Sequence, residues 1–339
     1  MYDKVSSGMI SDTEEYEIFR FEPKGEKGPS DFLQYFLSSF ILNYHGSCSD
    51  LGYWLKDLQN RFEGIYCNYT RDFFYAVKIN GTFAGRLWFA FSRKSGFGNF
   101  GHICTEPDFR RKGILHLLMK QFEKDFQIFQ PRFISCATGN PIAAKCYSSY
   151  GFSLPFGGET GPLIYGEDFQ KLQQEVFSIP SVRIRPGNPA DQFDCDKFLA
   201  IVPDLYMDKK YSKSSPLDFR TSLINTISGN GVLNVLENEN GIAVGYAFAQ
   251  NNYPENLIDF LIHPVYWDNA ELLLRQTIKE FYSKYSSSLT LCCSVTNDAV
   301  CKRSLLEKLN FKQISLISAD LWILDVRKFC DIENNPKIK

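Results

Sequence analysis

The chain has 339 residues, of which 44% are hydrophobic, 22% charged and 15% aromatic. This composition supplies enough apolar material for about two domains, which excludes a disordered or low-complexity protein. A net charge of −2 lacks the basic excess of a general nucleic-acid binder. The polar, acidic N-terminus does not resemble a signal peptide and no apolar run is long enough to span a bilayer, so we expect a cytoplasmic protein without membrane contact.

The first half of the chain alternates between strand and helix patterns after a polar start. We expect a flexible tail over residues 1–14. Apolar residues of period two predict strands, and apolar residues spaced three and four apart predict helices. The pair Asn80-Gly81 tolerates positive φ angles and therefore predicts a tight hairpin turn. The predicted strands are 15–21, 73–79, 82–91, 99–105 and 133–137, and the predicted helices are 31–44, 49–58, 111–126 and 141–150.

The second half repeats this order. The hairpin sequence Asn80-Gly81-x-x-x-Gly85 returns 160 residues later as Asn240-Gly241-x-x-x-Gly245. Pro107 and Asn140 have counterparts 157 residues on, Pro264 and Asn297. Landmarks in one order at nearly one spacing indicate a duplicated domain. We therefore expect two copies of a mixed α/β fold, a first domain over 15–165, a linker over 166–181 and a second domain over 182–339 that begins with a strand over 182–185 and a helix over 194–201.

The ten cysteines and four histidines do not indicate a metal site. No two cysteines have Cys-x-x-Cys spacing, and four histidines are too few and too scattered for a zinc cluster built from local sequence. We therefore expect free thiols and no bound metal.

The segment with the most chemical information is Arg110-Arg111-Lys112-Gly113. A predicted strand ends just before it, and a long amphipathic helix begins at once. The first amides of a helix have no internal acceptors and carry partial positive charge. A glycine lets the backbone approach a ligand closely, so the pattern favours a phosphate or pyrophosphate site. Taken alone, a basic helix start is more often a solvated surface, and this one is neither a Walker A loop nor the three-glycine dinucleotide fingerprint.

Two motifs resemble the GNAT superfamily of N-acetyltransferases. Arg110-x-x-Gly113 resembles motif A, although Gly or Ala usually stands where this chain has Leu115. Asn140-x-x-Ala143-x-x-x-Tyr147-x-x-x-Gly151-Phe152 resembles motif B. The resemblance covers about residues 15–165, whereas residues 182–326 share only the order of elements.

The resemblance implies acetyl-CoA as the cofactor and an amine of a small molecule or peptide as the acceptor. It implies that the strand ending at Thr105 separates from the next strand and admits the pantetheine arm. Tyr147 would be the catalytic general acid for the leaving thiolate, with a core tyrosine as the alternative. The residues that would contact the cofactor are Ile103, Cys104, Thr105, Arg110, Arg111, Lys112, Gly113, Ile114, Leu115, His116, Asn140 and Ala143.

The base that would deprotonate the amine stays unassigned. Relatives often place a carboxylate or histidine near the start of this strand, where this chain has Gly98-Asn99-Phe100-Gly101. His102 comes next with a different strand parity, and it is either a base or a packed or surface histidine. Glu106 lies at the end of the strand. His116 is either structural or near the phosphates.

The second copy lacks these features. At the 157-residue spacing, Trp267-Asp268-Asn269-Ala270 replaces the three cations and the glycine, and Ser304 or Leu306 replaces Tyr147. We therefore expect a second GNAT-like domain that binds no CoA. Two other functions stay open, namely a non-catalytic acyl-CoA-binding or regulatory protein and an acyltransferase with a longer acyl or aminoacyl donor.

Overall fold

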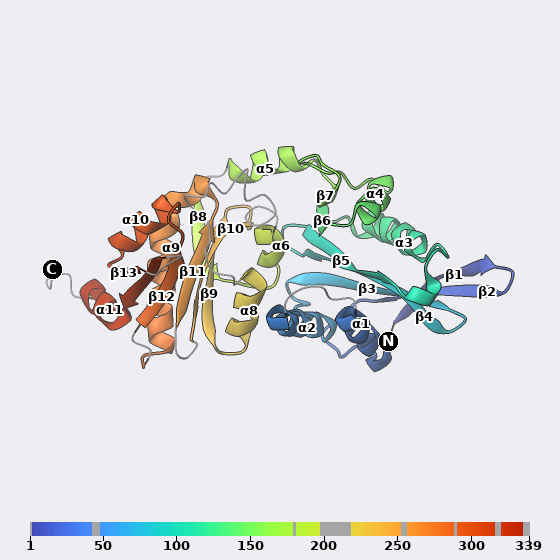
Figure 1. Cartoon of the computed structure of the whole chain (residues 1–339), viewed down its shortest axis with the longest axis horizontal. Coiled ribbons are helices and arrows are strands. Elements are labelled where there is room, and N and C mark those ends of the chain that lie inside the picture. Colours follow the sequence, from blue (N-terminus) through green and yellow to red (C-terminus); the bar gives the residue numbers. More distant parts are fainter. Residues whose placement is uncertain are drawn as a thin grey trace. The chain divides into compact units, whose positions relative to one another are not determined.

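The computed structural model describes residues 2–42, 48–178, 181–196, 218–251, 256–287, 290–315 and 320–334. The chain forms two compact units, Met1–Leu172 and Gln173–Lys339 (Figure 1). Their boundary lies in helix α5 (Phe169–Phe177), within the segment 166–181 that we expected to be a linker. Each unit contains one seven-stranded sheet with parallel and antiparallel pairs. The predicted fold class, a mixed α/β fold with two similar halves, is confirmed.

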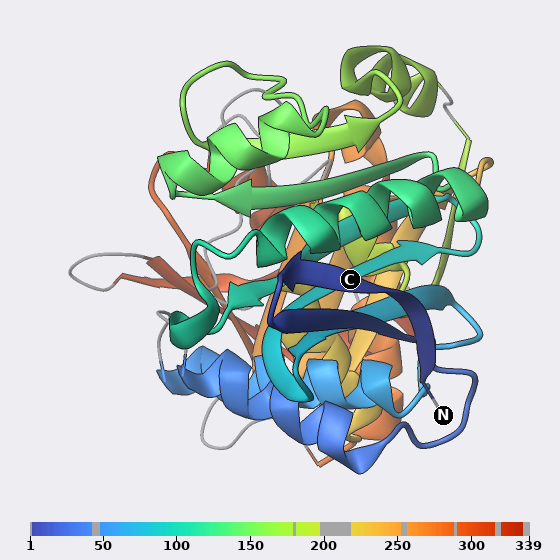
Figure 2. The same cartoon turned by 90° about the vertical axis from the view of Figure 1, so that its right-hand side faces the viewer.

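The sheet of the first unit has its strands in chain order from β1 to β7. Only β5 and β6 are parallel to each other. Helix α3 covers one face of the sheet, and helices α1 and α2 cover the other (Figure 2). The strands are β1 (Asp3–Ser11), β2 (Glu14–Phe21), β3 (Thr70–Ile79), β4 (Thr82–Ser92), β5 (Phe97–Thr105), β6 (Phe133–Thr138) and β7 (Gly161–Gly166), and the helices are α1 (Ser30–Leu42), α2 (Cys48–Phe62), the 3-10 turn η1 (Pro107–Phe109), α3 (Ile114–Phe129) and α4 (Pro141–Ser149).

The chain start differs from the expected flexible tail over residues 1–14. Asp3–Ser11 form the edge strand β1, which pairs with β2. Only Val5 and Ile10 of this strand pack against the core, so its hydrophobic pattern is weak. Hairpin pairing to β2, which begins after only two intervening residues, holds the segment in place. Within the predicted helix 31–44, residues 43 and 44 lie outside the described part of the chain.

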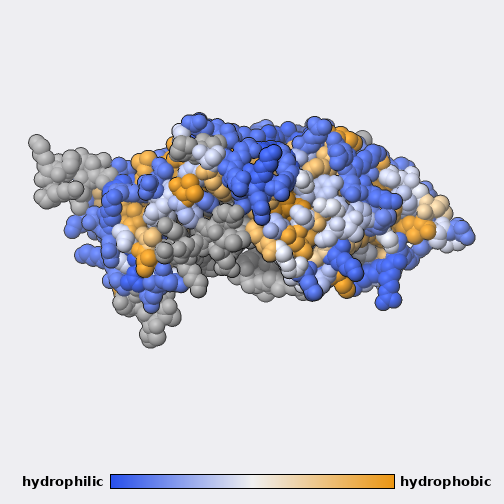
Figure 3. All heavy atoms as spheres, turned by 90° about the horizontal axis from the view of Figure 1, so that it is seen from above, coloured by the Kyte–Doolittle hydropathy of each residue, from blue (hydrophilic) through white to orange (hydrophobic). Residues whose placement is uncertain are grey.

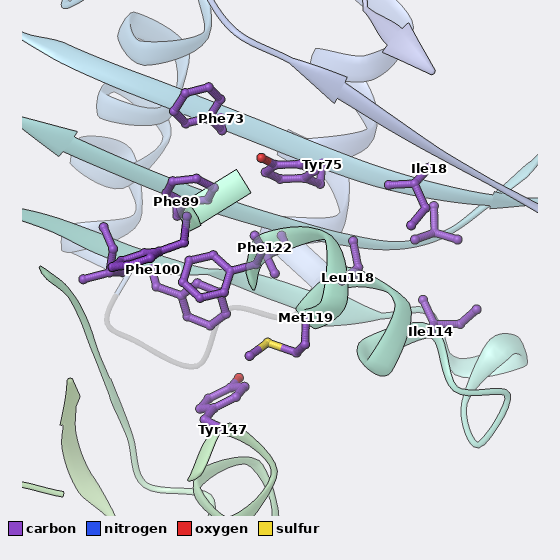
Figure 4. Close-up of a cluster of buried hydrophobic side chains, with 14 of the residues drawn as sticks. Ile18, Phe73, Tyr75, Phe89, Phe100, Ile114, Leu118, Met119, Phe122 and Tyr147 are labelled. Carbon is purple, nitrogen blue, oxygen red and sulfur yellow. The ribbon is translucent and has the colours of Figure 1, made fainter. Parts of the chain in front are cut away.

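The core of the first unit lies between α3 and the sheet. Leu118, Met119 and Phe122 follow one another along the inner side of α3 and face the strands (Figure 4). The Phe122 ring lies edge-on to Phe89, with the ring centroids 5.1 Å apart. Burial of each such side chain contributes about 1.5–3 kcal/mol. This packing fixes α3, and with it the start of the helix next to the end of β5.

Strand β5 is irregular on both of its edges. It pairs with β6 only from Phe97 to Asn99, and beyond this point the two strands separate. Toward β4, the register shifts between the pairs Arg86–Cys104 and Trp88–Gly101. His102 lies in the resulting bulge with a φ of 51°. The sheet is therefore open on the β6 side of β5, as the family resemblance implied.

The second unit repeats the arrangement, with strand order β8-β9-β10-β11-β12-β14-β13. Its parallel strands β11 and β12 pair at one position, Leu257 with Cys292. Gly245 pairs with Ile262 as Gly85 pairs with Thr105 in the first unit, which reproduces the 160- and 157-residue spacings. The elements are β8 (Val182–Pro186), α6 (Asp191–Cys195), α8 (Phe219–Ile227), β9 (Gly231–Asn238), β10 (Ala243–Gln250), β11 (Leu257–Ile262), η4 (Pro264–Asn269), α9 (Ala270–Lys284), β12 (Thr290–Val295), α10 (Val300–Lys308), β13 (Lys312–Ser315), β14 (Asp320–Asp325) and α11 (Val326–Asn334).

Two details of the predicted second copy differ. Asn297 is not the counterpart of Asn140, because Asn140 caps α4 directly whereas α10 begins three residues after Asn297. The helix expected over 194–201 is described only in part, as α6, and residues 197–217 lie outside the described residues.

The surface in Figure 3 shows hydrophobic side chains in separate patches among hydrophilic ones. Within the described ranges, no helix is both long enough and apolar enough to cross a membrane.

Candidate active site

The loop between β5 and α3 presents backbone amides. Arg111 and Gly113 both adopt left-handed conformations, with φ of 65° and 78°. This conformation is unfavourable for a residue with a Cβ, by about 1–2 kcal/mol, and such strain is concentrated at functional sites. No side chain caps the start of α3, and its first helical bond runs from the Leu117 amide to the Gly113 carbonyl. The amides of Ile114, Leu115 and His116 are therefore available to an anion.

The three predicted cations of this loop have different surroundings. Arg111 is exposed, and so is Arg110, whose Nε donates to the Thr105 carbonyl at 3.4 Å. Lys112 Nζ lies 2.6 Å from Glu14 Oε1 and holds the loop to β2. Arg111 is thus the cation of the three that combines an exposed side chain with the strained left-handed conformation. Leu115, which stands where the GNAT motif usually has Gly or Ala, does not crowd the loop, because its side chain packs against the core.

The predicted cofactor residues of β5 lie beyond the point where β6 departs. Ile103, Cys104 and Thr105 are all half-buried. The Ile103 side chain packs on the α3 side of the sheet. Cys104 interacts with Ser39 of α1 on the opposite side, and burial raises the pKa of its thiol. The strand therefore has one face toward α3 and the other toward α1.

Helix α4 begins at the predicted residue Asn140. The Asn140 side-chain oxygen accepts from the amides of Ile142 at 3.0 Å and Ala143 at 3.4 Å. A cap of this kind stabilises a helix by about 1 kcal/mol. Asn140 thus has a local structural task, while Ala143 is half-buried against the core.

Tyr147 of α4 lies where β5 and β6 separate. Its ring is 8% exposed and lies edge-on to Phe100, the first β5 residue beyond the paired segment, at 5.6 Å between centroids. Figure 4 shows its hydroxyl directed toward Met119 and Phe100. This hydroxyl makes no hydrogen bond within the part of the chain that the structure describes. Burial, and then the neighbouring thiols of Cys136 and Cys146, raise the pKa of Tyr147, so the phenol keeps its proton at neutral pH.

His116 and Tyr150 link the two helices that flank this region. The Tyr150 hydroxyl is hydrogen-bonded to His116 Nδ1. The side chain of His116 therefore joins α3 to α4.

A polar cluster on the α1 face was not predicted from the sequence. Glu106 Oε1 accepts from Tyr35 at 3.1 Å and Ser39 at 2.7 Å. Ser39 in turn accepts from Nε of Arg86, which is 2% exposed. A second Arg86 nitrogen donates to the His102 carbonyl at 2.6 Å. The contacts join residues 16 to 71 positions apart, so no local motif could reveal them.

The second unit differs from the first at each of these points. The turn η4 continues directly into α9, and no residue from His263 to Ala270 has a positive φ. The β10–β11 register has no bulge. Helices α4 and α10 both have nine residues, and their alignment pairs Ala143 with Lys302 and Tyr147 with Leu306. Lys302 is fully buried and forms an ion pair with Asp259 of β11.

Among the described residues, no group of three or more His, Cys, Asp or Glu side chains is placed to hold a metal ion.

A mixed sheet that opens between two parallel strands, with an amide-lined helix start beside the opening, is the architecture that the resemblance implied. Residues 34–152 match the model of the acetyltransferase (GNAT) family.

Several solved structures resemble this domain. They include an N-acetyltransferase from Staphylococcus aureus Mu50 (22% identity, 43% of this chain and 99% of that one, TM-score 0.32). A spermidine N-acetyltransferase from Vibrio cholerae in complex with CoA and spermine shares 11% identity (44% and 98%, TM-score 0.35). A phosphinothricin acetyltransferase from Sinorhizobium meliloti in complex with acetyl-CoA shares 16% (42% and 85%, TM-score 0.33). No curated protein sequence matches the chain significantly.

Proposed function

We propose that the first unit is an N-acetyltransferase that uses acetyl-CoA and acetylates an amine of a small molecule or peptide. The observation that carries this proposal is the loop with left-handed Arg111 and Gly113, which presents the uncapped amides of α3 beside the opening between β5 and β6. An amide cradle of this kind suits a diphosphate. The family match and the CoA-bound relatives are consistent with it.

Each part of the site has a task in this proposal. The amides of residues 114–116 and the Arg111 side chain bind the phosphates, and the open β6-facing edge of β5 at residues 103–105 binds the pantetheine arm as a strand would. Tyr147 donates its proton to the departing sulfur. Acetyl-CoA, when bound, supplies an acetyl group activated as a thioester.

The test is release of free CoA thiol from acetyl-CoA by the full chain, with a panel of primary amines as acceptors. Amine-dependent thiol release supports transfer. Binding of CoA without thiol release by any amine would favour the non-catalytic reading. Comparison with longer acyl-CoA donors addresses the remaining alternative, which no particular feature of the site favours.

Arg111→Glu is expected to weaken CoA binding by one to a few kcal/mol, about the value of one or two charge-assisted contacts. Lys120→Glu is the matched control, because it makes the same charge change at an exposed position of α3 further from the loop. Lys112 is left unchanged in this test, because Lys112→Glu would place a second carboxylate next to that of Glu14 and disturb the loop itself. Calorimetry on the full chain measures both variants, and equal affinities for the two would overturn the phosphate assignment.

A further inference from the structure

The bulge in β5 places His102 on the face of the sheet opposite Tyr147. The His102 ring lies edge-on to three aromatic rings, with centroid distances of 5.0 Å to Phe40, 5.9 Å to Trp54 and 5.3 Å to Trp88. These rings come from α1, α2 and β4, so they define the α1/α2 side of the sheet. Tyr147 contacts Phe100, whose side chain belongs to the core on the α3 side.

The opening in the sheet lies between these two groups. β5 and β6 separate after Asn99, so from Phe100 onward no ladder pair joins this edge of β5 to β6. Phe100 and His102 are the first and third residues of that stretch. A reacting carbonyl in the opening would therefore have an acid, Tyr147, on one side and an imidazole on the other. Addition of an amine and departure of a thiolate need proton transfers of opposite direction, which this arrangement provides.

His102 is held in this place at a cost. Its φ of 51° is unfavourable for a histidine, although less so than for a β-branched residue. Arg86, almost fully buried, holds the His102 carbonyl at 2.6 Å and is itself fixed by Ser39. In a regular strand, side chains two residues apart lie on the same face, so His102 would lie on the α3 side with Phe100. The second unit, which lacks the bulge, has Asp259 near this point and uses it for an internal ion pair.

We infer that His102 is the general base that takes the proton of the acceptor amine, and that the amine arrives from the side of α1 and α2. The inference rests on the proposed function. The imidazole first takes one proton from the alkylammonium and passes it to water, which leaves a neutral amine. This amine forms the carbon–nitrogen bond, and the acidic nitrogen of the adduct loses its second proton to water. As the carbon–sulfur bond breaks, one proton passes from Tyr147 to sulfur and water returns a proton to Tyr147, so that one proton in all is released to the solvent.

The test compares two acceptors with His102→Asn, because asparagine tolerates the left-handed conformation of the bulge better than most residues. The probes are a primary alkylamine accepted by the wild type and hydroxylamine, which is an uncharged nucleophile at neutral pH. Loss of a general base should slow transfer to the alkylamine by about 10²-fold or more and transfer to hydroxylamine by less than about tenfold. CoA affinity, measured by calorimetry, should stay unchanged.

His102→Gly, which also accommodates the positive φ, is the second variant if the first does not fold. Equal losses with both acceptors, or full rate with the alkylamine, would overturn the assignment of His102 while leaving the acetyltransferase intact. A wild-type chain that transfers to neither acceptor, nor to any amine of the panel, would instead overturn the proposed function.

Discussion

Tyr147→Phe is expected to slow the proposed acetyl transfer by about 10²-fold or more, the usual contribution of a positioned general acid, while the stability of the protein barely changes. The substitution removes one oxygen that makes no hydrogen bond within the described residues, and it keeps the ring contacts with Phe100 and Phe152. Because burial raises the pKa of Tyr147, the acid form persists throughout the neutral range. A plot of the wild-type transfer rate against pH should therefore show no change near neutral pH that comes from ionisation of Tyr147.

The measurement is thiol release at saturating acetyl-CoA, with thermal unfolding recorded alongside. Tyr165→Phe is the control, since it removes a hydroxyl from another tyrosine packed around Phe152 and Phe122. If Tyr147→Phe keeps the full rate, the leaving thiolate needs no acid or takes its proton from another group.

The elements that the sequence predicts well are those with a local cause. The stripe of Leu118, Met119 and Phe122 fixes the long helix, and Asn80-Gly81 fixes the hairpin turn. The loop that begins at Arg110 could be recognised from the sequence, because its glycine and the helix that follows are both encoded within a few residues. The relation between the two copies is visible for the same reason, since the turn glycines and prolines repeat.

The features that escaped prediction depend on which other segment of the chain each one contacts. Strand β1 has few core contacts of its own and is held in place by its pairing with β2. The position of His102 depends on a register shift against β4, which reverses the alternation that a regular strand would show. The cluster of Glu106, Ser39 and Arg86 assembles from three separate segments, namely the residue after β5, helix α1 and strand β4. None of these can be derived from spacing, because each is decided by which neighbour the segment meets.

The full chain is expected to bind one equivalent of CoA, in the first unit. In the second unit the counterpart of Ala143 is Lys302, whose chain extends from α10 to Asp259 of β11 next to the point where β11 and β12 part. This buried pair occupies the region that would have to admit a pantetheine arm. Asp268 also stands where the first unit has a cation, and two like charges about 4 Å apart repel by roughly 4 kcal/mol at an effective dielectric near 20. That repulsion corresponds to nearly three decades of affinity.

Ala143→Lys transfers this obstruction to the first unit. The half-buried position receives a lysine without a carboxylate counterpart, so the variant should lose CoA binding by about 10²-fold or more, since burying an unpaired charge or displacing a ligand costs several kcal/mol. Ile142→Lys is the matched control, because the adjacent residue is 82% exposed on the same helix and should keep wild-type affinity. Calorimetric titration of the full chain then separates the two units. One equivalent for the wild type and for Ile142→Lys, with none for Ala143→Lys, is the result expected if the first unit holds the whole capacity. Two equivalents for the wild type would mean that the second unit binds CoA despite Lys302, and one equivalent retained by Ala143→Lys would mean that residue 143 does not border the cofactor.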